Sequence, residues 1–365
     1  MNNYQLVFGL FLALAMASCE QSYQRLPIAP LDEAVSYQSR IDIDQPTSVL
    51  VDLYWSGAAV RVSYEGDSLF ATLQDERGDN YFNVIIDQDS VRLLSVDTTK
   101  TKYLLAAGLS SGSHTVELFK RTEWIRGKTT FFGFEVTGIA PKISKPAAKR
   151  RKMEFYGNSI TAGYAVDDGS GADSPDSVYT NHYVSYASLV ARHFDASYHS
   201  ICRSGIGVML SWFPMIMPEM YDRVVPTDST RRWDFATYTP AVVVINLFQN
   251  DSWLIEKQEH PEFKARFGEE KPRETQIVAA YQEFVLKIRA EYPEAHIVCL
   301  LGNMNVTQAG SPWPGYVAQA VALLGDDRIY AHAVPFKETP GHPNRAEQEL
   351  LAESLITFIN NHIEW

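Results

Sequence analysis

The repeating pattern of the chain changes near residue 150, and this change limits the folds that the chain can adopt. From residue 47 to residue 138, short β-type runs are separated by Gly, Asp and Ser turns, with no amphipathic helix pattern between them. These runs are residues 48–54, 58–64, 81–86, 91–96, 103–106, 114–119 and 129–136. Runs of this length and spacing predict an all-β sandwich or jelly roll of about a hundred residues.

After residue 153, strand-like runs alternate with helical patterns. The runs are residues 153–156, 197–202, 242–246, 297–301 and 329–331. Apolar side chains recur at helical spacing in residues 276–291, and Asn344 with Glu347 three positions later predicts the capped start of the last helix. Such alternation predicts a three-layer α/β domain, with a parallel sheet, helices on both faces and ligands at the carboxyl ends of the strands.

These patterns divide the chain into five segments. We expect a signal peptide at residues 1–18, a tether and lead-in at 19–45, a β-sandwich domain at 46–140, a linker at 141–152 and the α/β domain at 153–365. Two prolines and the basic run 149–152 indicate the linker, and we interpret the basic run as a solvated surface.

The N-terminus has the features of an export signal. Residues 6–17 form an apolar run too short to span a membrane, and Ala17 and Ser18 are small residues of the kind that precede a cleavage site. Residues 16–19, Met-Ala-Ser-Cys, resemble a bacterial lipobox, which implies lipidation of Cys19. The first five residues hold no Lys or Arg, so an ordinary cleaved signal peptide stays open. Either way we expect an exported protein, secreted or anchored through Cys19 in the outer membrane, facing the periplasm or the cell surface.

Charge and cysteine content exclude some partners. The formal net charge of −12 disfavours nucleic acid, whose phosphates would be repelled. Besides Cys19, the chain has Cys202 and Cys299, both at strand-like runs and without metal-type spacing. We expect buried free thiols, with a disulfide between them left open, and we expect neither a metal ion nor an organic cofactor.

A serine lies where a predicted strand stops and a helix starts. The run 153–156 leads into Gly157-Asn158-Ser159, and backbone N–H groups at such a turn point toward the group that the serine hydroxyl attacks. Asn and Ser are also common helix caps, so capping is the alternative. The nucleophile interpretation is favoured because residues 204–207, 249–251 and 341–344 supply the partners that a serine needs.

These four segments resemble the blocks of the SGNH (GDSL-type) hydrolases. The hallmark Ser, Gly, Asn and His of that family match Ser159, Gly205, Asn250 and His342. The resemblance implies a flavodoxin-like parallel sheet, with Ser159 as nucleophile and His342 as its base. It also implies an oxyanion hole formed by the backbone N–H groups of Ser159 and Gly205 and by the Asn250 amide. We expect the adjacent Asp251 to be structural.

The chain departs from that family pattern at two positions. The family usually carries an aspartate three residues before the histidine, and here that position is Thr339. We therefore expect a Ser159–His342 dyad, with the His342 ring held by a backbone carbonyl or a water molecule, and weaker catalysis than a full triad gives. The first block also reads Gly-Asn-Ser instead of Gly-Asp-Ser, which removes a negative charge beside the nucleophile.

The β-sandwich ahead of the α/β domain narrows the resemblance. With Trp-Ser-Gly at 55–57 and Ser-Gly-Ile-Gly-Val at 204–208, the chain is similar to carbohydrate esterase family 2 over about residues 30–365. This resemblance implies an N-terminal jelly roll and a serine esterase that removes O-acetyl groups from plant polysaccharides, such as xylan or glucomannan. Three alternatives stay open: an esterase for acyl lipids, an esterase for peptidoglycan O-acetyl groups, and a catalytically weak surface glycan-binding lipoprotein.

Aromatic side chains near the catalytic blocks are candidates for a sugar subsite, because a flat ring stacks on a pyranose. The candidates are Trp253, Trp313 and Tyr164, whereas we expect Trp212 to pack against its surroundings. Four aromatic residues of the β domain are expected in the core and rim rather than on a stacking platform: Trp55, Tyr64, Tyr81 and Trp124.

Overall fold

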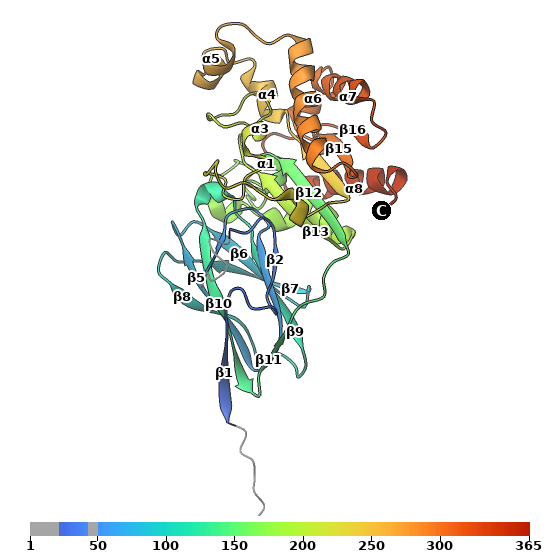
Figure 1. The fold of residues 1–365 in the computed structure, drawn as a ribbon. Helices are drawn as coiled ribbons and strands as arrows, with labels where there is room; N and C mark the ends of the chain where they lie inside the picture. Colours follow the sequence, from blue (N-terminus) through green and yellow to red (C-terminus); the bar gives the residue numbers. More distant parts are fainter. Residues whose placement is uncertain (1–21, 43–49) are drawn as a thin grey trace, which may run out of the picture.

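The computed structural model describes residues 22–42 and 50–365. The predicted signal peptide and Cys19 lie outside these residues. Figure 1 shows two parts stacked on each other, a β-sandwich formed by the N-terminal half and a sheet flanked by helices formed by the C-terminal half. Within the described chain, no helix combines the length and the apolar character needed to cross a membrane.

The N-terminal part consists of two antiparallel sheets. Its strands are β1 Tyr23–Ile28, β2 Ser36–Gln38, β3 Val51–Leu53, β4 Ala59–Glu65, β5 Ser68–Asp75, β6 Tyr81–Ile86, β7 Ser90–Ser95, β8 Thr101–Ala107, β9 His114–Lys120, β10 Thr129–Ile139 and β11 Lys142–Ser144. One sheet has the order β1-β10-β5-β8, with β3 paired to β10. The other has the order β11-β4-β9-β6-β7, with β2 paired to β4. Apolar side chains of both sheets meet in a shared core, which confirms the predicted sandwich.

The structure corrects three predictions about this part. Within the expected tether and lead-in at 19–45, the described residues 22–42 contain β1 and β2, which pair with β10 and β4 and are therefore part of the sandwich. The expected linker at 141–152 contains β11, which pairs with β4, and the start of the next strand at Arg151. Strand β5 is absent from the predicted runs, although its side chains alternate between buried and partly buried. Strands β1, β2 and β11 are stabilised by hydrogen bonds to partners far along the chain, which a local pattern does not show.

The C-terminal part is built on one parallel sheet with the order β13-β12-β14-β15-β16. Its strands are β12 Arg151–Gly157, β13 Ala196–Cys202, β14 Val242–Asn246, β15 His296–Leu301 and β16 Ile329–Ala333. The α-helices are α1 Ser159–Ala162, α2 Tyr186–His193, α3 Met217–Met220, α4 Gln249–Leu254, α5 Pro261–Phe267, α6 Glu274–Glu291, α7 Trp313–Leu324 and α8 Arg345–His362. The 3₁₀ turns are η1 Trp124–Arg126, η2 Ser177–Tyr179, η3 His182–Val184, η4 Phe235–Thr237 and η5 Asn305–Thr307.

Helices cover both faces of this sheet, which confirms the predicted three layers. Val242 and Val244 of β14 pack into the cluster that includes α2 and α8, whereas Val243 and Ile245 pack into the cluster that includes α6 and α7. A strand buried on both faces is typical of a parallel sheet. Asn344 caps α8 by accepting the backbone N–H of Glu347 at 3.0 Å, and the Glu347 carboxylate accepts the Asn344 N–H, as the capping-box pattern predicts.

The predicted buried thiols and aromatic side chains are confirmed. Cys202 and Cys299 are free and buried, and burial raises the pKa of each thiol to about 12. Of the four aromatic residues of the β domain, Trp55, Tyr64 and Trp124 are buried and Tyr81 is partly buried. The Trp55 indole N–H donates to the carbonyl of Val224 at 2.8 Å, so this tryptophan joins the two parts of the chain.

A fully buried ion pair also joins the two parts. Arg40, just after β2, donates from Nη2 to Oε1 of Glu154 on β12 at 2.8 Å, and neither side chain is exposed. The same guanidinium donates to the Tyr221 carbonyl at 2.5 Å and to the Tyr156 hydroxyl at 3.1 Å. Burial alone would raise the pKa of Glu154, but the Arg40 charge and the hydrogen bonds around the carboxylate outweigh burial and lower the pKa to about 2. The ion pair therefore requires the β domain to be docked on β12.

Replacing Arg40 by methionine should lower the free energy of unfolding by about 3–5 kcal/mol, because the substitution leaves the Glu154 carboxylate buried without its counter-ion. Urea unfolding measures the change. Arg25, an exposed residue of β1, offers the matched control, and Arg25→Met should change stability by less than about 0.5 kcal/mol. Combining Arg40→Met with Glu154→Leu should recover much of the loss. An Arg40→Met protein as stable as the wild type would contradict this role.

Candidate active site

Ser159 is the first residue of α1, two positions beyond the end of β12. In the sheet register, Gly157 lies opposite Cys202 of β13 and Asn246 of β14, so the segments that follow these strands begin at the same edge. Asn158 caps α1, because its Oδ1 accepts a backbone N–H of the first turn at 3.0 Å. Helix capping therefore falls to Asn158, which leaves the Ser159 hydroxyl for another partner.

The Ser159 hydroxyl lies against His342, as the family resemblance implies. Its Oγ is 2.8 Å from Nε2 of His342, and Nδ1 of the same ring is 2.8 Å from Oδ2 of Asp173. A carboxylate only accepts hydrogen bonds, so Nδ1 carries the proton and Nε2 accepts from the serine. Hydrogen bonding from His342 lowers the pKa of Asp173, which keeps the carboxylate ionised. The three side chains form a Ser-His-Asp triad.

Asp173 corrects the expected dyad. The sequence predicts a backbone carbonyl or a water molecule at the imidazole, whereas the structure places a carboxylate there. The Thr339 hydroxyl is hydrogen-bonded elsewhere. It accepts from the Lys337 ammonium at 2.6 Å and donates to the Glu347 carboxylate. The acid of the triad therefore comes from the loop after α1, and not from the block that contains the histidine.

One local feature beside His342 indicates the approach of Asp173. Gly341 has a φ of +72°, and a Cβ atom on this residue would lie 2.9 Å from Oδ1 of Asp173. The Asp173 carboxylate also accepts the His342 backbone N–H at 2.8 Å, so it fixes the backbone and the ring together. A glycine directly before the catalytic histidine is thus required by a close contact. Which carboxylate makes that contact is not visible in the sequence, because Asp173 lies in the irregular segment 163–176, remote from the histidine block.

Gly205 and Asn250 follow the two strands on either side of β12. Gly205 has a φ of +85°, a left-handed conformation that favours glycine. The Asn250 amide donates to the Ile206 carbonyl at 2.8 Å, and its Oδ1 accepts the Trp212 indole N–H at 3.1 Å. These bonds orient the amide and tie it to the loop that carries Gly205. Both residues follow strands that end at the sheet edge of Ser159, and their role as oxyanion donors stays a prediction.

Asp251 holds the loop after Gly205 in place, which confirms its structural interpretation. Its buried carboxylate accepts three successive backbone N–H groups, those of Val208, Met209 and Leu210, at 3.0, 2.7 and 2.9 Å. Burial raises the pKa of Asp251 to about 6, although the three hydrogen bonds oppose the shift.

Of the three predicted stacking residues, Tyr164 lies at the triad. Its ring centroid is 4.7 Å from that of the His342 imidazole. Trp253 is partly buried, and its indole N–H donates to Oδ1 of Asn305 at 3.0 Å. The interactions of Trp253 are thus with the protein, and a sugar contact at this residue stays a prediction.

The two remaining tryptophans have the opposite exposure to the one expected. Trp313 is only 7% exposed and packs edge-on against Phe248 in the core, so its proposed role in stacking is wrong. Trp212, which we expect to pack, is 42% exposed and holds the Asn250 amide. Trp313 begins α7 and lies on the same buried face of that helix as Val317 and Ala320. Trp212 lies instead in the irregular loop after Gly205.

The β domain supports the loop that carries Gly205. Glu123, directly before η1, is 2% exposed and accepts two hydrogen bonds from Ser204. The backbone N–H of Ser204 lies 2.6 Å from Oε2, and the Ser204 hydroxyl lies 2.5 Å from Oε1. A side chain of the first domain therefore fixes the residue next to a predicted oxyanion donor of the second.

The β domain also supports the loop that carries Asp173. Arg121 forms an ion pair with Asp167 at 2.8 Å, and Arg126 donates to the carbonyl of Pro175. These contacts lie on both sides of Asp173 along the loop. Sequence reasoning missed this role because a carboxylate or guanidinium in a β-domain turn looks like an ordinary surface residue.

A Ser-His-Asp triad at the carboxyl edge of a three-layer α/β sheet, with glycine and asparagine blocks in this order, defines an SGNH-type serine hydrolase. Comparison with known proteins specifies the family. The family model described as carbohydrate esterase 2 N-terminal matches residues 37–146. A family two carbohydrate esterase from Clostridium thermocellum, solved in complex with cellohexaose, is 32% identical, with a TM-score of 0.77 over 90% of this chain and 98% of that chain. The chain belongs to carbohydrate esterase family 2, a family of carboxylic ester hydrolases.

Curated relatives extend the comparison. The cellulase/esterase CelE of Acetivibrio thermocellus is 32% identical over 346 residues, which are 91% of this chain but 40% of that protein, so the chain spans less than half of it. An acetylxylan esterase / glucomannan deacetylase of Cellvibrio japonicus is 24% identical and matches 93% of this chain and 91% of that protein. A family two carbohydrate esterase structure from the same organism, 22% identical, shares the fold with a TM-score of 0.81.

Replacing Asp173 by asparagine should reduce kcat for 4-nitrophenyl acetate by about a hundredfold or more, because an amide in this place favours the wrong imidazole tautomer. Steady-state hydrolysis measures the effect. Asp176→Asn, an exposed position in the same loop, is the matched control and should retain most of the activity. A wild-type kcat for Asp173→Asn would show that a Ser159–His342 dyad is sufficient.

Replacing Glu123 by glutamine should lower kcat about tenfold and leave KM within about twofold, because the amide can keep only one of the two bonds from Ser204 and the oxyanion loop loses its position. The control is Glu135→Gln on β10, whose partner is Lys102 of the same domain. Thermal unfolding of each variant shows whether a lower kcat comes from a displaced Gly205 loop or from loss of the folded protein. An unchanged kcat for a folded Glu123→Gln protein would contradict the positioning role.

Proposed function

We propose that the protein is a serine esterase that removes O-acetyl groups from plant polysaccharides or from oligosaccharides derived from them. The observation that carries this proposal is the continuous hydrogen-bonded path from Ser159 through His342 to Asp173. A serine hydroxyl is a weak nucleophile at neutral pH, and an oriented base within hydrogen-bond distance activates it.

In the proposed reaction, Ser159 Oγ attacks the acetyl carbonyl carbon while Nε2 of His342 takes the hydroxyl proton. The ionised Asp173 stabilises the resulting imidazolium. The N–H groups of Ser159 and Gly205 and the amide of Asn250 donate to the oxygen that gains negative charge. His342 then gives its proton to the leaving sugar oxygen as the C–O bond breaks. A water molecule, deprotonated by His342, then attacks the acetyl carbon. The bond from this carbon to Ser159 Oγ breaks, acetate leaves, and His342 returns the proton to Oγ.

The carbohydrate substrate is supported by the relatives and by the surroundings of the triad. Two of the similar proteins carry the names acetylxylan esterase / glucomannan deacetylase, and a family member was solved with cellohexaose. The exposed indole of Trp212 lies beside Asn250, and Tyr164 lies beside His342, so aromatic faces flank the site. Such faces suit the apolar side of a pyranose.

The decisive experiment measures acetate release from acetylated xylan and acetylated glucomannan, beside hydrolysis of short and long acyl esters of 4-nitrophenol. The wild type should release acetate, and Ser159→Ala should lose at least about a thousandfold in rate, because the nucleophile is removed. Ser110→Ala, an exposed position in the β domain, is the matched control.

Other outcomes would replace the substrate or the reaction. A preference for long acyl chains would indicate that the substrate is an acyl lipid. Release of acetate only from O-acetylated peptidoglycan would indicate that the substrate is the cell wall. Saturable glycan binding without turnover of any ester would favour a surface glycan-binding lipoprotein. The complete triad supports catalysis over that last alternative.

We also propose that the protein is exported and is anchored to a membrane only through a lipid on Cys19. This proposal rests on the apolar run at 6–17 and on the Met-Ala-Ser-Cys sequence that follows it. An anchor at this position would leave the domain free in the periplasm or at the cell surface, where polysaccharide substrates are found.

A further inference from the structure

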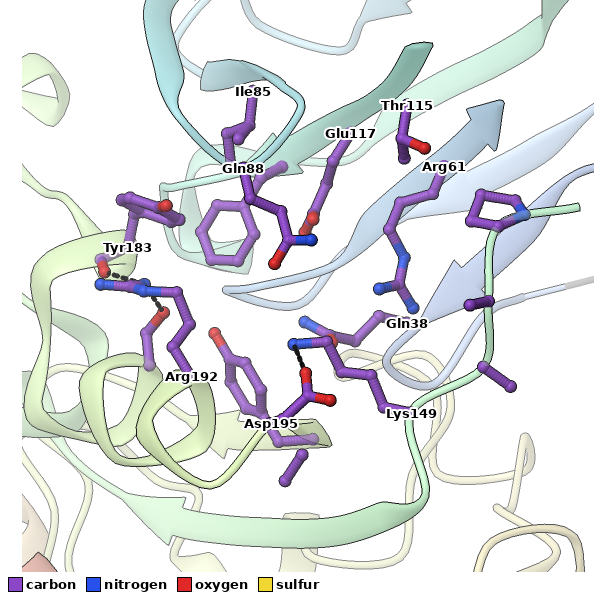
Figure 2. A pocket seen from close by; sticks show the side chains of 17 residues that line it. Gln38, Arg61, Ile85, Gln88, Thr115, Glu117, Lys149, Tyr183, Arg192 and Asp195 are labelled. Carbon is purple, nitrogen blue, oxygen red and sulfur yellow. Dashed lines mark hydrogen bonds and ion pairs between the residues drawn. The ribbon is translucent and has the colours of Figure 1, made fainter. Parts of the chain in front are cut away.

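A cavity of about 370 Å³ lies between the β-sandwich and the α/β domain (Figure 2). Its walls come from the sheet β11-β4-β9-β6-β7, from residues 146–149 and from helix α2, and none of the triad residues lines it. On β13 the cavity contacts Ala196 and Tyr198, whereas the triad lies beyond the other end of the sheet. A strand rises about 3.3 Å per residue, so the four steps from Tyr198 to Cys202 at the end of β13 put roughly 13 Å between this wall of the cavity and the catalytic edge.

An arginine and a glutamate whose side chains form no hydrogen bond among the described residues face this cavity. Arg61 of β4 and Glu117 of β9 are directly opposite each other in the antiparallel register. Their chain neighbours, such as Val60 and Val116, point into the sandwich core, so these two side chains point out of it, toward α2. In the described part of the chain, neither the Arg61 guanidinium nor the Glu117 carboxylate has a hydrogen bond or an ion pair, and the Arg61 Nε is buried.

Further charged groups complete the lining. Lys149 pairs with Asp195 at 3.3 Å, and the Asp195 side chain is 80% exposed, which marks the solvent side of the cavity. Arg192 of α2 donates to the Tyr183 carbonyl at 2.6 Å with one of its terminal nitrogens. Burial raises the pKa of Glu117 although the charges of Arg61, Lys149 and Arg192 oppose the shift. Three cations and two carboxylates, Glu117 and the exposed Asp195, therefore line a cavity in a protein with a net charge of −12.

We propose that this cavity is a second, non-catalytic binding site for a sugar that carries a carboxylate, that is, a uronic acid residue. Arg61 and Glu117 are both only partly exposed, and within the described chain the buried Arg61 Nε has no hydrogen bond. A polar group without a hydrogen bond is unfavourable where water is excluded, and a ligand that bonds to it offsets that penalty. A ligand carboxylate complements Arg61 and Lys149, and guanidinium binds such a group with two parallel hydrogen bonds. Sugar hydroxyls complement Glu117 and the amide of Gln88, which points into the same space.

The mixed charge of the cavity favours an acidic sugar over a simple anion. The Glu117 carboxylate repels an acetate ion, which offers no hydrogen-bond donor, and a phosphate ion, which concentrates its negative charge beside its few hydroxyl groups. It accepts hydrogen bonds from the several hydroxyl groups that a sugar carries away from its carboxylate. The volume of the cavity falls within the range of about 300–1,000 Å³ that is typical of small-molecule sites, and ligands often bind at domain interfaces.

Calorimetric titration of the full chain tests this site independently of esterase activity. The probes are glucuronate and xylotriose bearing one glucuronate, compared with xylotriose alone, inorganic phosphate and acetate. We expect saturable binding of the two uronates and, for Arg61→Gln, at least about tenfold weaker binding, which corresponds to the loss of one charge-assisted hydrogen bond. Arg25→Gln, at an exposed position of β1, is the matched control and should bind as the wild type does.

The comparison between probes decides the interpretation. Glu117→Gln should weaken glucuronate binding less than Arg61→Gln does, and Arg61→Gln should leave hydrolysis of 4-nitrophenyl acetate unchanged, which also shows that the variant is folded. Equal binding of phosphate, acetate and glucuronate would overturn the sugar specificity. Absence of uronate binding, or uronate binding that Arg61→Gln does not weaken, would overturn the site. Loss of esterase activity in Ser159→Ala with intact uronate binding would separate this site from the catalytic one.

Discussion

The buried ion pair between Arg40 and Glu154 sets the arrangement on which the rest of the molecule depends. Removing two charges from water is expensive, by several kcal/mol per ion, and the penalty is offset only where the charges meet in good geometry. Arg40 comes from the first part of the chain, and Glu154 lies on β12, the strand that leads to Ser159. A side chain that comes from the β domain is therefore buried against a strand of the hydrolase sheet, and this contact joins the two parts into one structural unit.

The same interface extends to the catalytic edge. Glu123 fixes Ser204 beside Gly205, and Arg121 fixes Asp167 in the loop that presents Asp173. The C-terminal sheet places the nucleophile at the start of a helix, but the segments that carry Gly205, Asp173 and His342 are irregular loops. Such loops need partners for their backbone and side-chain groups, and here the β domain supplies several of them. The jelly roll is thus part of the active-site framework, whatever else it binds.

Much of the site was predictable because its residues lie at places that local patterns reveal. Ser159 lies two positions after the end of a strand, Asn250 follows another strand, and His342 precedes a capped helix. Asp173 has no such pattern, since it lies in a loop of polar residues and glycines where every aspartate looks alike. In the family's usual spacing, the aspartate lies three residues before the histidine. That position is Thr339 here, so the spacing suggests that the triad has no acid. Likewise, Trp313 and Trp212 look equivalent as sequence positions, although the helix buries one ring and the loop exposes the other.

The sequence by itself determined the two classes of structure and their order, because hydrophobic periodicity of two or of about 3.6 residues is a local property of the chain. It also predicted Ser159 as the nucleophile, His342 as its base and the parallel sheet that brings them to one edge. Only the tertiary structure decided which carboxylate contacts His342, which domain holds the loop that carries Gly205, and that Arg61 and Glu117 face a shared cavity. Those outcomes depend on contacts between segments far apart in the chain, whose energies arise from burial and charge pairing that no local pattern encodes.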